Sequence, residues 1–124
     1  MTMKASERQV SGIAIIDLSG KITLGEGGAV LRNMVRDAVT RGHKNILLNL
    51  GEVTYIDSAG LGMVAACAGI IFKAGGKLVV VSPGGRITQM FEITRLNRVI
   101  DLYSDFDAAC AAFTTTSTAG SEVS

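Results

Sequence analysis

Two compact apolar runs with a long apolar segment between them constrain the fold more than any other feature of the sequence. The runs are Asn45-Ile-Leu-Leu-Asn-Leu50 and Lys77-Leu-Val-Val-Val81. Both have the length and composition of strands that are buried on both faces, as in parallel sheets covered by helices. Residues 59–74 between them are apolar on nearly all sides and lead into Gly75-Gly76, which predicts a well-buried helix that crosses from one strand to the next.

The N-terminal part of the chain adds strands and a helix to this unit. The segment from Gln9 to Leu18 predicts two short strands or one bent hairpin with Ser11-Gly12 as its turn, and a second turn is expected at Ser19-Gly20. An amphipathic helix that ends at Gly42 follows, because apolar residues recur at intervals of three and four. These residues are Val30, Leu31, Met34, Val35, Ala38 and Val39.

The C-terminal part continues the alternation of helices and strands. A helix is expected to carry Ile87, Met90, Phe91 and Ile93, followed by a short strand over 100–103 and a last helix over 106–113. Alternating strands and helices with short connections predict an α/β fold with a mainly parallel sheet. The final residues, 114–124, are small and polar without periodicity, and we expect them to form a disordered tail.

Composition and charge exclude several classes of function. Twelve Lys and Arg against eleven Asp and Glu give a net charge of +1, and six Phe and Tyr without Trp form no stacking platform, so nucleic acid is not an expected partner. The longest uncharged stretch, 58–72, is shorter than the ~20 residues that cross a bilayer, so no membrane insertion is expected. The polar N-terminus lacks a secretory signal, which favours a cytoplasmic protein.

Residues suited to catalysis, metal binding or phosphate binding are sparse. The only histidine is His43, in a helix-end setting typical of a solvated residue, and Cys67 and Cys110 lie in apolar helical patterns that imply neither a disulfide nor a metal site. The cluster Gly25-Glu-Gly-Gly28 lacks the Lys-Ser/Thr of a P-loop and is interpreted as a turn with positive φ, and Pro83-Gly-Gly-Arg86 as a strand-to-helix turn. We therefore expect no catalytic residue, metal or cofactor, and an enzyme or nucleotide-binding module that uses these glycines is the weakest alternative.

The segment Tyr55-Ile-Asp-Ser-Ala-Gly-Leu-Gly62 places an acid and a hydroxyl together before the long apolar helix. Asp57 and Ser58 are both preferred helix N-cap residues, so capping is the simplest explanation of either. One cap needs only one side chain, however, and Gly60 and Gly62 each weaken a helix start by about 0.5 to 1 kcal/mol relative to alanine. The pattern indicates that a bare backbone is needed there.

The sequence resembles the STAS domain family of bacterial anti-sigma factor antagonists over about residues 8–113. The likeness rests on the segment Asn49–Gly62, with Asp-Ser-Ala-Gly-Leu-Gly as its most specific part, and on the segments Leu78–Val81 and Met90–Leu96. It implies one STAS-type domain over residues 1–113, with a small, mixed, mostly parallel sheet of four or five strands and about four helices.

The resemblance also implies a function. In this family the hydroxyl residue after the Asp is phosphorylated by a partner anti-sigma factor, a serine kinase of the histidine-kinase-like ATPase type, and the matching residue is Ser58. The unmodified protein would bind the kinase and release a sigma factor, and phosphorylation would end binding. The expected partner-binding residues are Asp57, Ser58, Ala59, Gly60, Leu61 and Gly62.

Individual roles and one competing function stay open at this stage. Gly60 and Gly62 are expected to let a kinase approach Ser58, Asp57 to orient the loop or assist the hydroxyl, and Leu61 to be either a core anchor or an exposed contact. The alternative function is a STAS adaptor subunit of a lipid-transport ATPase complex, which would act without phosphorylation.

Overall fold

The computed structural model describes residues 3–23, 26–81 and 83–113 of the chain. These residues form one five-stranded sheet in the order β1-β2-β3-β4-β5, in which only the β1–β2 pair is antiparallel. The predicted α/β fold with a mixed, mostly parallel sheet is therefore confirmed. The strands are β1 (Lys4–Val10), β2 (Ile13–Ile22), β3 (Asn45–Ile56), β4 (Lys77–Val81) and β5 (Asp101–Tyr103).

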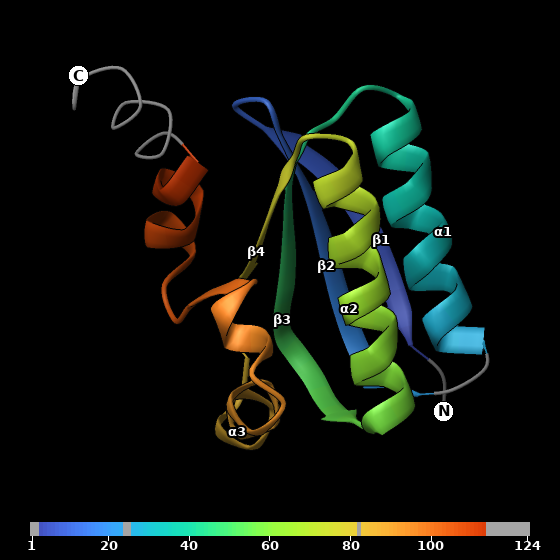
Figure 1. Cartoon of the computed structure of the whole chain (residues 1–124), viewed down its shortest axis with the longest axis vertical. Helices are drawn as coiled ribbons and strands as arrows, with labels where there is room; N and C mark the ends of the chain where they lie inside the picture. Colours follow the sequence, from blue (N-terminus) through green and yellow to red (C-terminus); the bar gives the residue numbers. More distant parts are fainter. Residues whose placement is uncertain (1–2, 24–25, 82, 114–124) are drawn as a thin grey trace.

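Helices cover both faces of the sheet (Figure 1). The long helices α1 (Glu26–Thr40) and α2 (Ser58–Lys73) lie side by side on one face, and helical residues 106–113 pack on the other. A shorter helix, α3 (Gly85–Ile93), and a single 3-10 turn, η1 (Leu96–Arg98), connect β4 to β5. No helix of the described residues has the combination of length and hydrophobicity that crossing a membrane requires.

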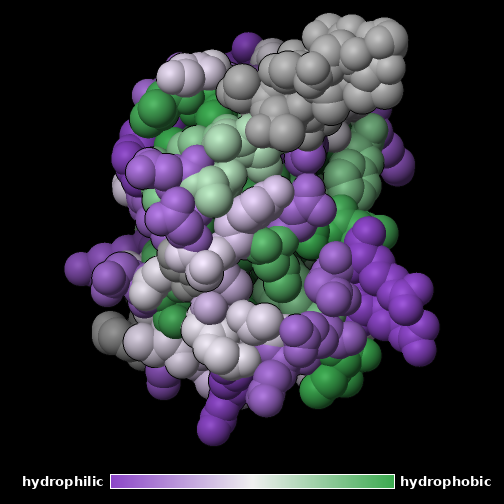
Figure 2. All heavy atoms as spheres, turned by 90° about the vertical axis from the view of Figure 1, so that its left-hand side faces the viewer, coloured by the Kyte–Doolittle hydropathy of each residue, from purple (hydrophilic) through white to green (hydrophobic). Residues whose placement is uncertain are grey.

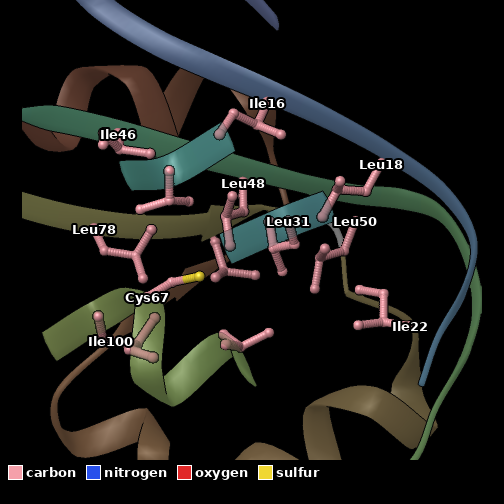
Figure 3. Close-up of a cluster of buried hydrophobic side chains, with 14 of the residues drawn as sticks. Ile16, Leu18, Ile22, Leu31, Ile46, Leu48, Leu50, Cys67, Leu78 and Ile100 are labelled. Atoms are coloured by element: carbon pink, nitrogen blue, oxygen red, sulfur yellow. The ribbon is translucent and has the colours of Figure 1, made fainter. Parts of the chain in front are cut away.

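Alternate residues of the central strands supply two separate cores. Ile16 and Leu48 point into the larger core under α1 and α2 (Figure 3), whereas their neighbours Ile15 and Leu47 lie in the smaller core under residues 106–113. All four are fully buried. Because successive strand side chains point to opposite faces, covering both faces requires the uninterrupted apolar runs seen in the sequence.

The N-terminal hairpin confirms one predicted turn and corrects another. Ser11 and Gly12 form a two-residue turn between the paired residues Val10 and Ile13, with φ of 51° and 81°, as the favoured hairpin turns require. The prediction of a turn at Ser19-Gly20 is wrong. Strand β2 continues to Ile22 through register shifts between Asp17 and Ser19 and between Gly20 and Lys21. Such irregularities bend a strand without ending its pairing.

The glycines before the first helix also differ from expectation. Glu26, Gly27 and Gly28 belong to the start of α1 rather than to a positive-φ turn, while Gly25 lies outside the described residues. A Cβ on Gly28 would lie 3.2 Å from the backbone oxygen of Thr23. These glycines therefore allow close packing of the helix start against the end of β2, a contact that local sequence does not signal. At the other end of α1, Gly42 has φ of 100° and ends the helix as predicted.

The second face of the sheet is tied to the C-terminal helix by a polar cluster. The Nε atom of Arg8 donates to Asp17 Oδ2 at 2.7 Å, and the guanidinium lies 5.0 Å from the centre of the Phe106 ring. This hydrogen bond, with a second from Asn49, holds the pKa of Asp17 below its usual value. The cluster thus joins β1, β2 and β3 to residues 106–113, the helix that the sequence predicts. The tail 114–124 lies outside the described residues, and the domain boundary at 113 stays a prediction.

Candidate functional site

Ser58 is the first residue of α2 and is exposed to solvent. The preceding Asp57 is the N-cap: it has extended backbone geometry, and its Oδ1 accepts a hydrogen bond from Gly60 N at 2.7 Å. A side chain in this position satisfies one of the otherwise unpaired amides at the helix start. Since Asp57 does this, the fold has no need of the Ser58 hydroxyl as a cap.

Gly60 is bare because the helix start lies directly on the end of β2. Gly60 is buried, and an ideal Cβ there would lie 2.1 Å from the carbonyl oxygen of Ile22. The same carbonyl accepts a hydrogen bond from Asp57 N at 3.3 Å. Gly60 is therefore required for packing of α2 against β2, a reason that the sequence did not reveal.

The other members of the predicted site differ in exposure. Leu61 is only 4% exposed and belongs to the larger core, so it is a core anchor. Gly62 is exposed, with open space where a Cβ would be placed, and Ala59 is partly buried. The surface around Ser58 that is open to a partner thus runs toward Gly62, while Gly60 and Leu61 set the position of the helix below it.

An apolar groove lies beside Ser58, between α2 and the segment of α3 and η1. Its volume is about 430 Å³, and none of the described residues that line it is charged. Figure 2 shows apolar side chains between charged ones on the face of the molecule that carries α3. The lining residues are Ser58, Leu61, Gly62, Ala65, Met90, Ile93, Thr94 and Leu96.

Five of the eight residues that line the groove lie outside the predicted site 57–62: Ala65, Met90, Ile93, Thr94 and Leu96. Ile87 and Phe91, one turn apart on α3, are buried, and this leaves Ile93 with 79% of its surface exposed. An apolar residue outside the buried helical face is a weak sequence signal for such a surface. The neighbouring residues Met90 and Leu96 could not be assigned to it, because only the tertiary fold places them opposite α2.

The histidine and the two cysteines, for which the sequence predicts no functional role, lie far from Ser58 or are unsuited to act as nucleophiles. His43 precedes β3, at the opposite end of that strand from Ser58. Its Nε2 atom lies 3.1 Å from Gln9 Nε2. Burial raises the pKa of the Cys67 thiol to about 12, so it stays protonated at neutral pH. Both cysteines are free, and no group of three or more potential metal ligands occurs in the described part of the chain.

Substitutions of Asp57 can separate the contribution of its N-cap hydrogen bond to stability from the contribution of its negative charge. Asp57→Ala should destabilise the protein by about 1 kcal/mol, because the amide of Gly60 loses its acceptor. Asp57→Asn should retain most of the stability, since asparagine is an equally good N-cap. Urea denaturation of the two variants measures this difference, and equal destabilisation by both would mean that the carboxylate charge, rather than capping, is what matters.

Comparisons with known proteins agree with this architecture. Residues 4–109 match the model of the STAS domain. The "Putative anti-sigma factor antagonist BtrV" of Bordetella bronchiseptica is 27% identical over 113 residues, which cover 91% of this chain and 97% of that protein. The "Putative anti-sigma factor antagonist TM1081 homolog" of Thermotoga neapolitana is 32% identical over 71 residues, 57% of this chain and 63% of that protein.

Solved structures show the same fold at low sequence identity. The Bacillus cell fate determinant SpoIIAA in its phosphorylated form superimposes with a TM-score of 0.70 at 17% identity, covering 88% of this chain and 99% of that chain. The anti-sigma factor antagonist SpoIIAA in its unphosphorylated form gives a TM-score of 0.71 at 15% identity. Because the family model covers most of the sequence, the chain belongs to the STAS domain family.

Proposed function

We propose that this protein is an anti-sigma factor antagonist whose activity is switched by phosphorylation of Ser58. Its unmodified form binds an anti-sigma factor serine kinase and thereby releases a sigma factor, and the phosphorylated form does not bind. The protein is then a binding partner and a kinase substrate rather than an enzyme. Two relatives whose names are those of anti-sigma factor antagonists support the assignment, one of them along nearly the whole chain.

The observation that carries the proposal is the position of Ser58. Its residue is exposed at the start of α2, and capping is already provided by Asp57. A kinase can therefore reach the hydroxyl without unfolding any element. A phosphate there would meet the free amides and the positive end of the helix dipole, which favour an anion by about 0.3 to 1 kcal/mol.

The same phosphate would act strongly on a docked partner. It adds about −1.5 to −2 charges, beside the carboxylate of Asp57. Facing like charges, or burying a charge without a partner, costs about 2 to 5 kcal/mol at an interface. The helix start can accommodate this charge, but a tightly packed interface cannot. The modification is therefore expected to dissociate the complex while leaving the fold intact.

The direct test is phosphorylation by the purified cognate anti-sigma factor kinase with Mg-ATP. Mass spectrometry should find one phosphate, on Ser58, and Ser58→Ala should remain unmodified under the same conditions. Transfer to another residue, or no transfer, contradicts the proposed switch. Co-purification with a membrane transporter that is insensitive to Ser58 substitution would instead establish the adaptor function.

A further inference from the structure

We propose that the groove between α2 and α3 receives an apolar side chain carried by an acidic segment of the kinase that phosphorylates Ser58. This inference rests on the proposed function and adds to it a second, permanent binding element beside the switch. Contacts in the groove contribute to the affinity for the kinase in the unmodified state, and phosphorylation of Ser58 prevents those contacts from forming.

The first argument is continuity between the groove and the phosphorylated residue. Ser58 is itself part of the groove wall, and Gly62, one turn further along α2, is another part. A stable protein interface covers about 800 Å² per partner, a patch about 30 Å across. A kinase interface of this size that includes Ser58 is expected to extend over the groove, and a cavity left unfilled there would lose van der Waals contacts.

The second argument is the exposure of Ile93 on the rim of the groove. With 79% of its surface exposed, Ile93 is the most exposed large hydrophobic residue in the described part of the chain. It contributes little to the core of the isolated domain, whereas Met90, one turn earlier on α3, is partly packed against that core. A few well-packed and fully desolvated side chains near the centre of an interface typically carry most of its binding energy.

The third argument concerns the charge of the segment that enters. Arg86 lies four residues before Met90 and seven before Ile93, which places all three on one side of α3. Arg95 lies between the groove residues Thr94 and Leu96. Neither arginine has an ion pair within the described residues, and both are exposed. Neither arginine lines the groove itself, but residues 85–98 carry three arginines against the single carboxylate of Glu92, and this positive balance favours an acidic partner segment.

The acidic segment also explains how the switch would act on this surface. A phosphate on Ser58 would place a strong negative charge at the groove wall, facing carboxylates that the arginines otherwise attract. The groove and the switch are then two parts of one docking site.

The experiment measures binding of the purified kinase that phosphorylates Ser58, by isothermal titration calorimetry. Ile93→Ala should weaken binding about 10- to 100-fold, the range typical of a central apolar contact. The double variant Arg86→Glu/Arg95→Glu should weaken binding at least about 10-fold and reduce its dependence on salt. Phe72→Ala is the matched control. Phe72 is another exposed apolar residue, but it lies near the C-terminal end of α2, whereas Ser58 is at the N-terminal end of that helix. The affinity of this variant for the kinase should not change.

The outcomes separate this inference from the proposed function. If Ser58 is phosphorylated and Ser58→Asp abolishes binding while Ile93→Ala binds like the wild type, the groove is not the docking site and the switch stands. Unchanged or tighter binding by the arginine double variant would exclude an acidic segment. A wild-type dimer in light scattering that Ile93→Ala converts to a monomer would show that a second copy of the chain occupies the groove. If no kinase modifies Ser58, the proposed function and this inference both fail.

Discussion

Gly60→Ala is expected to destabilise the protein by about 3 kcal/mol or more, the largest effect among alanine substitutions of the three glycines of α2. The new Cβ would lie 2.1 Å from the carbonyl oxygen of Ile22 and 2.7 Å from its carbonyl carbon. Both atoms belong to the backbone of a central strand, so α2 has to move away from β2. Overpacking of this kind costs about 1 to 3 kcal/mol and more where the neighbour cannot yield.

Two other glycines of the same helix provide matched controls. Gly62 and Gly69 both have open space where a Cβ would be placed. Gly62→Ala and Gly69→Ala should therefore stabilise the protein by about 0.5 to 1 kcal/mol, the difference in helix propensity between alanine and glycine. Urea denaturation of the three variants tests this order, and a Gly60→Ala variant as stable as Gly62→Ala would show that the contact with Ile22 is not tight in solution.

The two controls also test binding. Gly62 lies on the groove beside Ser58, whereas Gly69 lies two turns further along α2 and outside it. A partner that needs a bare backbone near Ser58 would therefore discriminate between Gly62→Ala and Gly69→Ala, although the two variants should be equally stable.

Ser58→Asp is expected to weaken binding to the anti-sigma factor kinase by about 30- to 5,000-fold, whereas Ser58→Ala should bind like the wild type. This range corresponds to the about 2 to 5 kcal/mol that an unpaired or like-charged group costs at an interface, at ~1.4 kcal/mol for each factor of ten. Both variants should retain the stability of the wild type within about 0.5 kcal/mol, because Ser58 is exposed and is not the cap.

Asn33→Asp serves as the charge control for this experiment. Asn33 is exposed on α1, so the substitution adds the same single charge outside the proposed docking site. Calorimetry should find its affinity unchanged. Equal affinities of Ser58→Asp and Ser58→Ala for the kinase would exclude electrostatic disruption as the mechanism of the switch.

Elements with a strong local signal were predicted well. The apolar runs at β3 and β4, the αL position of Gly42 and the Ser11-Gly12 turn all follow from short stretches of sequence, because strand burial, helix ends and tight turns depend on neighbouring residues. The errors occurred where local composition and tertiary context disagree. Ser19-Gly20 has the composition of a turn, but pairing with β3 keeps it in the strand.

The sequence by itself determined that a helix begins near Asp57 and Ser58, since an N-cap residue before a long apolar helix is a local signal. It also required helices on both faces of the sheet. Only the tertiary structure decided which of the two side chains caps the helix and why Gly60 must be glycine. It also decided that α3 lies opposite α2 to form the groove. These features depend on contacts between residues far apart in the chain, such as Gly60 with Ile22, and periodicity and propensity carry no information about such pairs.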